Sequence, residues 1–338
     1  MIVSFIIVAY NAEEFLNTTL DALKKQEYDK KKIEVILVDS ASKDLTKKIM
    51  LDFKKKNNKI YKRVCILDNP KKILPCGWNV ALKEASGDVI LRVDAHSTFD
   101  KNFVKENVKE IKNGENIVGG HRISITSSTS RWQKLLLIAE QSLFGSGIAK
   151  YRRTEKKEYV NTLAHAMYRK KVFDEVGLYN ENLARTEDNE MHYRMKKAGY
   201  KFLLSPNIVS YHHARNSFKG MVKQKYGNGK WIGITMYYCP RCFSLYHFIP
   251  FVFVIGLVLS LILLFFKFPW FILLITVLYA LFNIFNIITI SIKNKFHIEY
   301  LLLPFIFLAL HISYGVGTIN GLLYGPIYKR RKNEENIA

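Results

Sequence analysis

The stretch Gly87–Thr98, GDVILRVDAHST, decides the fold of this chain. Its apolar run, Val89–Val93, follows a Gly-Asp pair and ends in Asp94 and His96. A short apolar run between polar residues predicts a buried strand, and residues two apart in a strand share one face. Two potential metal ligands at a strand end predict a divalent-cation site. An ordinary polar turn after the strand is the alternative.

Earlier apolar runs repeat this arrangement at Val3–Ala9, Ile33–Val38 and Val64–Leu67. The first two lead into a polar loop and then into residues with helical spacing. Strands that alternate with helices predict an α/β domain with a mainly parallel, Rossmann-like sheet, whose ligands bind beyond the carboxyl ends of the strands. Because Asn11, Asp39 and Asp94 each follow such a run, we expect them to line one edge of the sheet.

The sequence contains neither GxGxxG nor GxxxxGK[ST]. These patterns are typical of loops that hold phosphates with backbone N–H groups. A metal ion is therefore the expected means of neutralising a bound diphosphate.

The C-terminal third of the chain is dominated by three apolar runs, Phe248–Phe266, Pro269–Ile292 and Tyr300–Tyr324. Each is roughly 19 to 25 residues long, enough to cross a hydrocarbon core of about 30 Å. The expected organisation is a soluble domain over 1–233, an interfacial connector over 234–247, a transmembrane region over 248–325 and a basic tail over 326–338.

The formal net charge is +22 at pH 7. Such an excess suits nucleic acid or anionic lipid, and the apolar runs favour a lipid bilayer as partner and no nucleic acid. The N-terminal run is too short for a secretory signal, so we expect the soluble domain in the cytoplasm. The four cysteines are too scattered for a disulfide framework, and all, including Cys239 and Cys242, are expected to be free thiols.

Three segments in the middle of the chain carry weaker signals. Ile117–Gly120 and Arg122–Thr126 are predicted strands. Trp132–Leu143 has helical spacing and precedes a basic loop, Lys150–Lys157. The helix and loop are either a core helix with a solvated loop or an interfacial helix with a basic flap. The histidines within Tyr211–Arg215 are interpreted as structural, since no acid lies near them in sequence.

Four segments in order resemble the family 2 glycosyltransferases, which have the GT-A fold: VAYNAEEFL (8–16), VILVDSASKD (35–44), GWNVALKEASGDVILRVDAH (77–96) and LARTEDNEMHYRMKKAGY (183–200). Within this family they resemble the membrane-anchored, succinoglycan-type exopolysaccharide glucosyltransferases. The resemblance implies a metal-dependent hexosyltransferase with a nucleotide-sugar donor, UDP-linked by expectation.

The resemblance places the donor site at Tyr10, Asn11, Asp39, Asp44, Gly77, Asn79, Arg92 and Asp94. Asp39 would read uracil, and Asp44 either assists or caps a helix. Arg92 would reach the nucleotide or its phosphates. Asp94 and His96 take the metal-binding Asp-x-Asp position, and His96 in place of the second acid leaves Mn²⁺ and Mg²⁺ both open.

The resemblance also implies that Glu187 and Asp188 are catalytic. Asp188 would be the base, and Glu187 would orient the site or contact the donor sugar; N-capping of a helix is the alternative. Gln224, Lys230 and Trp231 would face the acceptor and diphosphate, or else lie on a plain interfacial helix.

The predicted protein is a multi-pass enzyme of the cell membrane, an inverting glycosyltransferase of cell-surface or exopolysaccharide synthesis. Its acceptor would be lipid-linked or a saccharide. A polyprenyl-phosphate sugar synthase is the alternative, followed by a non-catalytic nucleotide-binding scaffold. One conflict stays open: three full crossings would place the basic run Lys329–Lys332 outside, against the positive-inside tendency.

Overall fold

The computed structural model describes residues 1–338 except 127, 129, 147, 154, 155, 216 and 338. The chain forms two compact units: unit 1 comprises Met1–Ile125 and Ala149–His213, and unit 2 comprises Thr126–Ile148 and Ala214–Ala338. Gly147 and two residues of the predicted basic loop, Thr154 and Glu155, lie outside the described residues. The expected domain boundaries at 233, 247 and 325 stay predictions.

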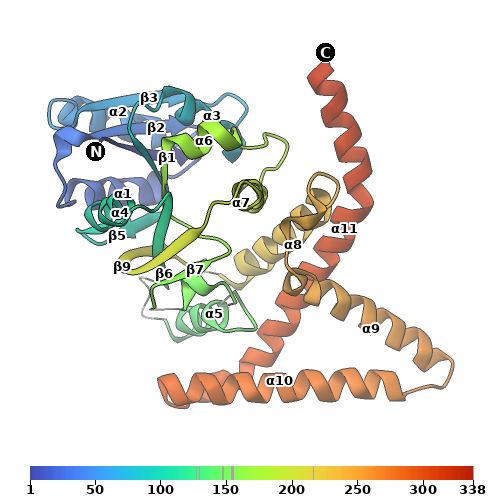
Figure 1. Ribbon diagram of the computed structural model, residues 1–338. Coiled ribbons are helices and arrows are strands. Elements are labelled where there is room, and N and C mark those ends of the chain that lie inside the picture. Colours follow the sequence, from blue (N-terminus) through green and yellow to red (C-terminus); the bar gives the residue numbers. More distant parts are fainter. Residues whose placement is uncertain (127, 129, 147, 154–155, 216, 338) are drawn as a thin grey trace. The chain divides into compact units, whose positions relative to one another are not determined.

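Unit 1 is built on a sheet whose strands follow the order β3-β2-β1-β4-β8-β6-β9-β5, with β7 paired to β9 (Figure 1). The strands are β1 (Val3–Ala9), β2 (Ile33–Asp39), β3 (Arg63–Asp68), β4 (Val89–Asp94), β5 (Ser97–Phe99), β6 (Ile117–Ile125), β7 (Glu158–Val160), β8 (Ala166–Arg169) and β9 (Phe202–His213). The half formed by β1 to β4 is parallel, as predicted, whereas β8 runs antiparallel to both β4 and β6.

The register of the parallel strands confirms the predicted polar edge. Ala9 of β1 lies opposite Asp39 of β2, and Val8 lies opposite Asp94 of β4. The carboxyl ends of these strands therefore meet.

The prediction of separate strands at Ile117–Gly120 and Arg122–Thr126 is wrong. They form one strand, β6, and only its pairing with β9 shifts register between Gly120 and His121.

Helices cover both faces of the sheet. Alternate residues of β1 point to opposite faces, as the pleat requires: Phe5 and Ile7 pack in one core and Ile6 and Val8 in the other. The first core is covered by α1 (Glu13–Lys24), α2 (Thr46–Asn57) and α4 (Phe103–Lys112). The second core is covered by α3 (Leu74–Glu84), α6 (Lys170–Val176) and α7 (Glu187–Lys197).

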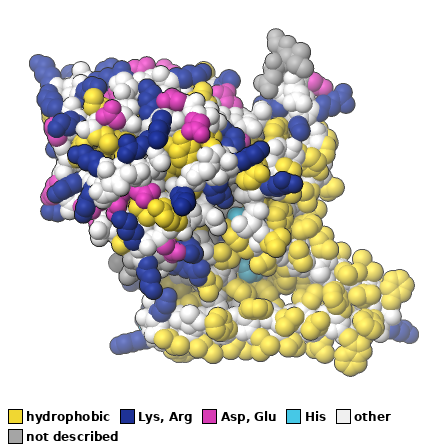
Figure 2. All heavy atoms as spheres, in the orientation of Figure 1, with side chains coloured by type: hydrophobic (Ala, Val, Ile, Leu, Met, Phe, Trp, Pro, Cys, Tyr) yellow, Lys and Arg dark blue, Asp and Glu magenta, His cyan; other side chains and the backbone are white. Residues whose placement is uncertain are grey.

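Unit 2 is helical, with α5 (Arg131–Gln141), α8 (Phe218–Thr235), α9 (Ile249–Phe265), α10 (Trp270–Asn294) and α11 (Leu303–Ile337). The spans Leu245–Phe265, Trp270–Asn294 and Ile298–Glu335 are long and apolar enough to cross a membrane. Hydrophobic side chains cover α9 and α10 in Figure 2. The apolar side of α5 packs against α10 and α11 and belongs to the core of this unit.

Glycines bring α8 and α11 into close contact. The backbone of Tyr226 lies against Gly317, and that of Lys230 lies against Gly321. A side chain at Gly233 would come within 2.6 Å of the backbone of Thr318 and Leu322. Small residues at helical spacing allow two helix backbones to approach in this way.

The prediction of free thiols is wrong for one pair of cysteines. Cys239 and Cys242 form a disulfide, because the 3₁₀ turn Pro240–Cys242 brings their Cα atoms within 5.5 Å. Cys65 and Cys76 are free, as expected.

Candidate active site

The loops after β1 and β2 hold each other at the carboxyl edge of the sheet. Asn11 has a left-handed backbone, with φ 46°, which asparagine tolerates better than most residues. Its N–H donates to Ser42 Oγ at 3.0 Å, and its Oδ1 accepts from the Lys43 N–H at 2.9 Å. Tyr10 is 52% exposed. Asn11 therefore fixes the loop, while Tyr10 presents a ring on which a nucleotide base can stack.

Two acids of the β2 loop have different environments. Asp39 is buried, and its two carboxylate oxygens accept from the Ser42 N–H at 3.3 and 3.4 Å. Asp44 accepts from the N–H groups of Glu13, at 3.1 Å, and Thr46, at 3.0 Å. Because these residues begin α1 and α2, Asp44 caps two helices. Of the two roles left open for Asp44, helix capping is the one that its contacts show.

The start of α3 packs tightly against the rest of the site. A Cβ at Gly77 would lie 2.5 Å from Val8 Cγ1, so glycine lets α3 approach β1. The Asn79 amide donates to the Tyr179 carbonyl at 2.9 Å, and its Oδ1 accepts from the Tyr179 N–H at 2.9 Å. In this structure Asn79 thus positions the segment before α7.

Arg92 joins α3, β4 and α7. Its guanidinium lies 4.6 Å from the ring centre of Trp78 and 5.5 Å from that of Tyr179. Nη1–H donates to the Tyr179 hydroxyl at 3.2 Å, and Nη2–H donates to Glu187 Oε1 at 3.3 Å. Its predicted contact with the nucleotide is untested. These contacts with α3, Tyr179 and α7 make Arg92 a group that positions Glu187.

The two predicted catalytic acids lie in the first turn of α7. Glu187 is buried, and burial together with the neighbouring Asp188 raises its pKa to about 8. Its Oε2 has no hydrogen-bond partner among the described residues. Burial also raises the pKa of Asp188, against the opposing charge of Arg92, and Asp188 Oδ1 accepts from the Asn189 N–H at 2.8 Å. A carboxylate whose pKa is raised is a better proton acceptor near neutral pH.

A carboxylate and two imidazoles converge at the end of β4. Ligand atoms of Asp94, His96 and His212 all lie within 4.8 Å of one another. The His96 and His212 rings are 4.7 Å apart, and the pairing of β5 with β9 aligns Ser97 with His212. The Nδ1 of His212 is buried without a hydrogen-bond partner among the described residues. An orphaned imidazole nitrogen beside a carboxylate fits a metal ion, and nitrogen ligands suit Mn²⁺ better than Mg²⁺.

A buried histidine, His165, orients the carboxylate of Asp94. His165 Nε2 lies 3.2 Å from Asp94 Oδ2, and His165 Nδ1 lies 3.0 Å from Ser210 Oγ. Burial disfavours the charged carboxylate, but the hydrogen bond from His165 and the nearby His96 and Arg92 outweigh it. They hold the pKa of Asp94 well below its ordinary value. Asp94 is therefore charged at neutral pH, as a metal ligand must be.

Sequence reasoning missed four of these residues: Trp78, His165, Tyr179 and His212. The histidines near 212 were interpreted as structural for want of a nearby acid, but Asp94 lies beside His212 in the fold. Only the pairing of β5 with β9 brings them together. No local pattern in the sequence carries that information.

The predicted acceptor residues belong to unit 2, where all of them lie on α8. Lys230 Nζ is 5.0 Å from the ring centre of Tyr324, and the Trp231 ring is 5.5 Å from that of Tyr328. Both side chains thus contact α11. For Gln224 the structure gives only its place on the helix.

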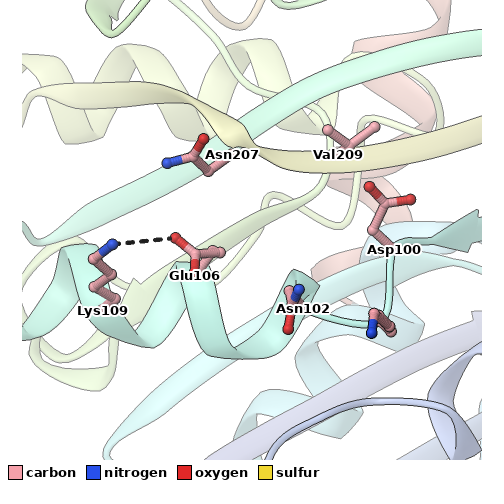
Figure 3. Close-up of a pocket in the computed structure, with 7 residues that line it drawn as sticks. Asp100, Asn102, Glu106, Lys109, Asn207 and Val209 are labelled. Atoms are coloured by element: carbon pink, nitrogen blue, oxygen red, sulfur yellow. Dashed lines mark ion pairs between the residues drawn. The ribbon is translucent and has the colours of Figure 1, made fainter.

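The hollows formed by described residues on the surface of unit 1 include the two that follow. One, of about 390 Å³, is lined by Asn11, Glu13, Glu14, Phe15, Lys43 and Asp44, and so adjoins the predicted nucleotide edge. The other, of about 580 Å³, lies between α4 and β9 (Figure 3) and is lined by Asp100, Lys101, Asn102, Glu106, Lys109, Asn207 and Val209. None of the predicted site residues lines the second hollow. Its Glu106 and Lys109 pair at 3.6 Å.

The sequence matches the model of a known family over residues 4–177, described as glycosyl transferase family 2. A glycosyltransferase of Methanococcus voltae is 26% identical over 96% of this chain and 98% of its own length. It is named a dolichyl N-acetyl-alpha-D-glucosaminyl phosphate 3-beta-D-2,3-diacetamido-2,3-dideoxy-beta-D-glucuronosyltransferase. The succinoglycan biosynthesis protein ExoA of Rhizobium meliloti is 28% identical over 58% of each chain.

The fold is shared with solved structures. The mannosyltransferase PcManGT of Pyrobaculum calidifontis, in complex with GDP-Man and Mn²⁺, aligns with a TM-score of 0.57 at 15% identity. The alignment covers 94% of this chain and 86% of that one. At this identity the likeness supports the fold alone. Together with the family match over residues 4–177, it confirms the predicted GT-A fold, and the apolar helices α9, α10 and α11 follow this domain in the chain.

Proposed function

Because the chain belongs to glycosyl transferase family 2, we propose that it is a membrane-anchored inverting enzyme that moves a sugar from a UDP-sugar to a lipid-linked or saccharide acceptor. The observation that supports this most is the arrangement at the carboxyl end of the sheet. The potential metal ligands Asp94, His96 and His212 lie there. The acids Glu187 and Asp188 belong to the same unit. Arg92 of β4 forms an ion pair with Glu187 at the start of α7.

An inverting transfer needs a carboxylate that removes the proton of the acceptor hydroxyl as its oxygen attacks the anomeric carbon. Asp188 is our candidate for this base, since it is less buried than Glu187 and its pKa is raised. Glu187, held by Arg92, would orient the acceptor or donor sugar beside it. The bond to the leaving diphosphate breaks on the opposite face of the sugar.

The donor diphosphate carries charge that must be stabilised as it leaves. Asp94, His96 and His212 would hold a divalent cation, Mn²⁺ in preference to Mg²⁺, which supplies Lewis-acid stabilisation of that charge when bound. His165 keeps Asp94 oriented for this purpose. The exposed ring of Tyr10 and the buried Asp39 would bind the nucleoside at the same edge.

A lipid-linked acceptor fits the apolar helices of unit 2 and the name of the Methanococcus voltae relative, which specifies a dolichyl phosphate-linked sugar. A multi-pass anchor with a cytoplasmic catalytic domain follows as part of the proposal. For Gln224, Lys230 and Trp231 the acceptor role stays a prediction. The alternative, a polyprenyl-phosphate sugar synthase, differs in its product, which would be a lipid monophosphate sugar.

The test is a screen of nucleotide-sugars with the purified full chain, Mn²⁺ and membrane lipid extract, in which release of nucleoside diphosphate is measured. We expect release with a UDP-sugar, dependent on the lipid, and a product that carries the sugar on an existing lipid-linked saccharide. A lipid monophosphate sugar as product would establish the synthase instead. Nucleotide-sugar binding without release or transfer, over the whole panel, would contradict both.

A further inference from the structure

The C-terminal ends of α8 and α11 lie side by side within unit 2. The two helices run in the same direction, because the backbone contacts advance together from Tyr226 with Gly317 to Lys230 with Gly321. Beyond the end of α8, the Tyr237 hydroxyl donates to the Leu322 carbonyl at 2.8 Å. The end of α8 therefore lies beside the segment of α11 around Leu322 and Gly325.

Aromatic side chains gather at this level. Tyr328 is the centre of the group, with ring centres 5.5 Å from Trp231, 6.0 Å from Tyr324 and 6.5 Å from Tyr238. We call these four residues, with Tyr237, the terminal cluster. Tyrosine and tryptophan concentrate where a bilayer meets water, because their rings are apolar at one end and polar at the other. The terminal cluster thus has the composition of an interfacial belt.

Two lysines lie on the aromatic faces of the terminal cluster. Lys230 Nζ is 5.0 Å from the ring centre of Tyr324, and Lys329 Nζ is 5.6 Å from that of Tyr238. Lys329 also donates to the Tyr237 carbonyl at 2.8 Å. Among the described residues no carboxylate pairs with either lysine. An ammonium group has three N–H donors, so both lysines keep donors for an anion.

The neighbouring basic residues differ in this respect. Arg330 pairs with Glu334 at 2.9 Å, and Lys332 pairs with Glu335 at 2.5 Å. Each of these two cations thus has a carboxylate partner within α11. Lys230 and Lys329, by contrast, contact aromatic rings, and Lys329 also a carbonyl, so their charges remain available to an external anion.

The surroundings of the two lysines favour an anion that carries apolar chains. Leu323 is 73% exposed and Ile327 is 52% exposed. On α11 they directly precede two members of the terminal cluster, Tyr324 and Tyr328. A free phosphate would leave these side chains in water, whereas a phospholipid covers them with its acyl chains while its phosphate reaches the lysines.

We propose that the terminal cluster with Lys230 and Lys329 binds the phosphate headgroup of an anionic phospholipid of the surrounding bilayer. This inference rests on the membrane association in the proposed function, but not on the transfer reaction.

The test uses the purified full chain in non-ionic detergent, titrated with phosphatidylglycerol or with phosphatidylcholine of the same acyl chains, with bound lipid counted by native mass spectrometry. We expect tighter binding of phosphatidylglycerol. Lys230→Gln with Lys329→Gln should weaken it by about 30-fold, because each lysine near an anionic lipid contributes about fivefold in affinity. Binding of phosphatidylcholine should not change.

The matched control is Lys267→Gln with Lys295→Gln, which removes the same charge from two exposed lysines at the ends of α10. This control should bind phosphatidylglycerol like the wild type, and Lys230→Arg with Lys329→Arg should retain most of the affinity. Equal losses in the test and control pairs would overturn the proposal, as would competition by inorganic phosphate at the concentration at which phosphatidylglycerol binds. Neither readout depends on sugar transfer, so an inactive enzyme would leave the test intact.

Discussion

Two buried glutamates, each paired with an arginine, occupy opposite ends of the parallel strands of unit 1. At the amino end, Glu34 accepts from Arg63 at 2.7 Å, from the Ser86 N–H at 2.6 Å and from the Gly87 N–H at 3.0 Å. These bonds outweigh the effect of burial and lower its pKa to about 2. At the carboxyl end, Glu187 accepts a longer bond from Arg92, at 3.3 Å, and its pKa is raised to about 8.

The difference separates a structural acid from a functional one. Glu34 has donors for its charge and is ionised at any ordinary pH, so it ties three strands and a loop together. Glu187 lacks them, and an unsatisfied buried carboxyl oxygen costs stability. A fold retains such a group where it serves binding or catalysis. The predictions below test this distinction, from the largest expected effect to the smallest.

The largest effect is expected at Asp188. Asp188→Asn should lower the rate of sugar transfer by about 1,000-fold, because the acceptor hydroxyl then lacks its base. The unfolding midpoint should stay close to that of the wild type. Asp174→Asn, an exposed acid on α6, is the control and should change neither quantity. Transfer at the wild-type rate by Asp188→Asn would remove Asp188 from the mechanism.

A substitution at the amino end of the sheet should change the stability of the protein but not its activity. Glu34→Gln removes the buried charge that accepts from Arg63 and from the Ser86 and Gly87 N–H groups, and should lower the free energy of unfolding by about 3 kcal/mol, measured by denaturant titration. Transfer activity per folded molecule should be unchanged. Since the pKa of Glu34 is depressed, its contribution is present above the ordinary carboxyl pKa and is lost as the pH falls toward 2. A large loss of activity in folded Glu34→Gln would break the comparison.

The carboxyl end should respond in the opposite sense. Because the folded pKa of Glu187 is raised, the unfolded state loses its proton first, and stability falls as the pH rises from about 4.5 to about 8. Glu187→Gln removes this effect and should stabilise the protein at pH 8 by about 1–2 kcal/mol while it lowers activity. Unfolding measured at pH 5 and pH 8 checks the sign. Destabilisation at both values would show that Glu187 is a structural acid.

The smallest effect is expected from replacing each arginine with lysine. Arg92→Lys keeps the charge but loses the planar group between Trp78 and Tyr179, and should lower transfer by about tenfold through misplacement of Glu187. Arg63→Lys should lower stability but not activity. Comparison of kcat with KM for donor and acceptor distinguishes positioning from binding. A rise in donor KM alone would instead support the predicted contact of Arg92 with the nucleotide.

Local sequence patterns carried much of this account. Apolar runs that end in Asn11, Asp39 and Asp94 predicted the parallel strands and their shared edge, because strand and loop chemistry are local. The paired acids at 187 and 188 were recognisable from a resemblance. Their environment was not, since the burial of Glu187 and its bond to Arg92 depend on residues 95 positions apart.

Long-range pairing explains what the sequence could not predict. His212 reaches Asp94 only through the pairing of β5 with β9, and Trp78 meets Arg92 only after α3 packs on the sheet. The disulfide of Cys239 and Cys242 depends on a single 3₁₀ turn within a segment that gives no such signal. The mixed half of the sheet, from β8 to β9, likewise lacks an alternating strand–helix pattern.

The most direct test of the difference between the two ends is Mn²⁺ binding by the purified protein in the presence of UDP, followed by electron paramagnetic resonance. If Asp94, His96 and His212 form a metal site, we expect one bound ion per chain. Binding should be lost in His212→Ala and retained in the neighbouring control His213→Ala. Undiminished Mn²⁺ binding by a folded His212→Ala variant, or no binding by the wild type, would contradict the assignment of the carboxyl end as the reactive end of the sheet.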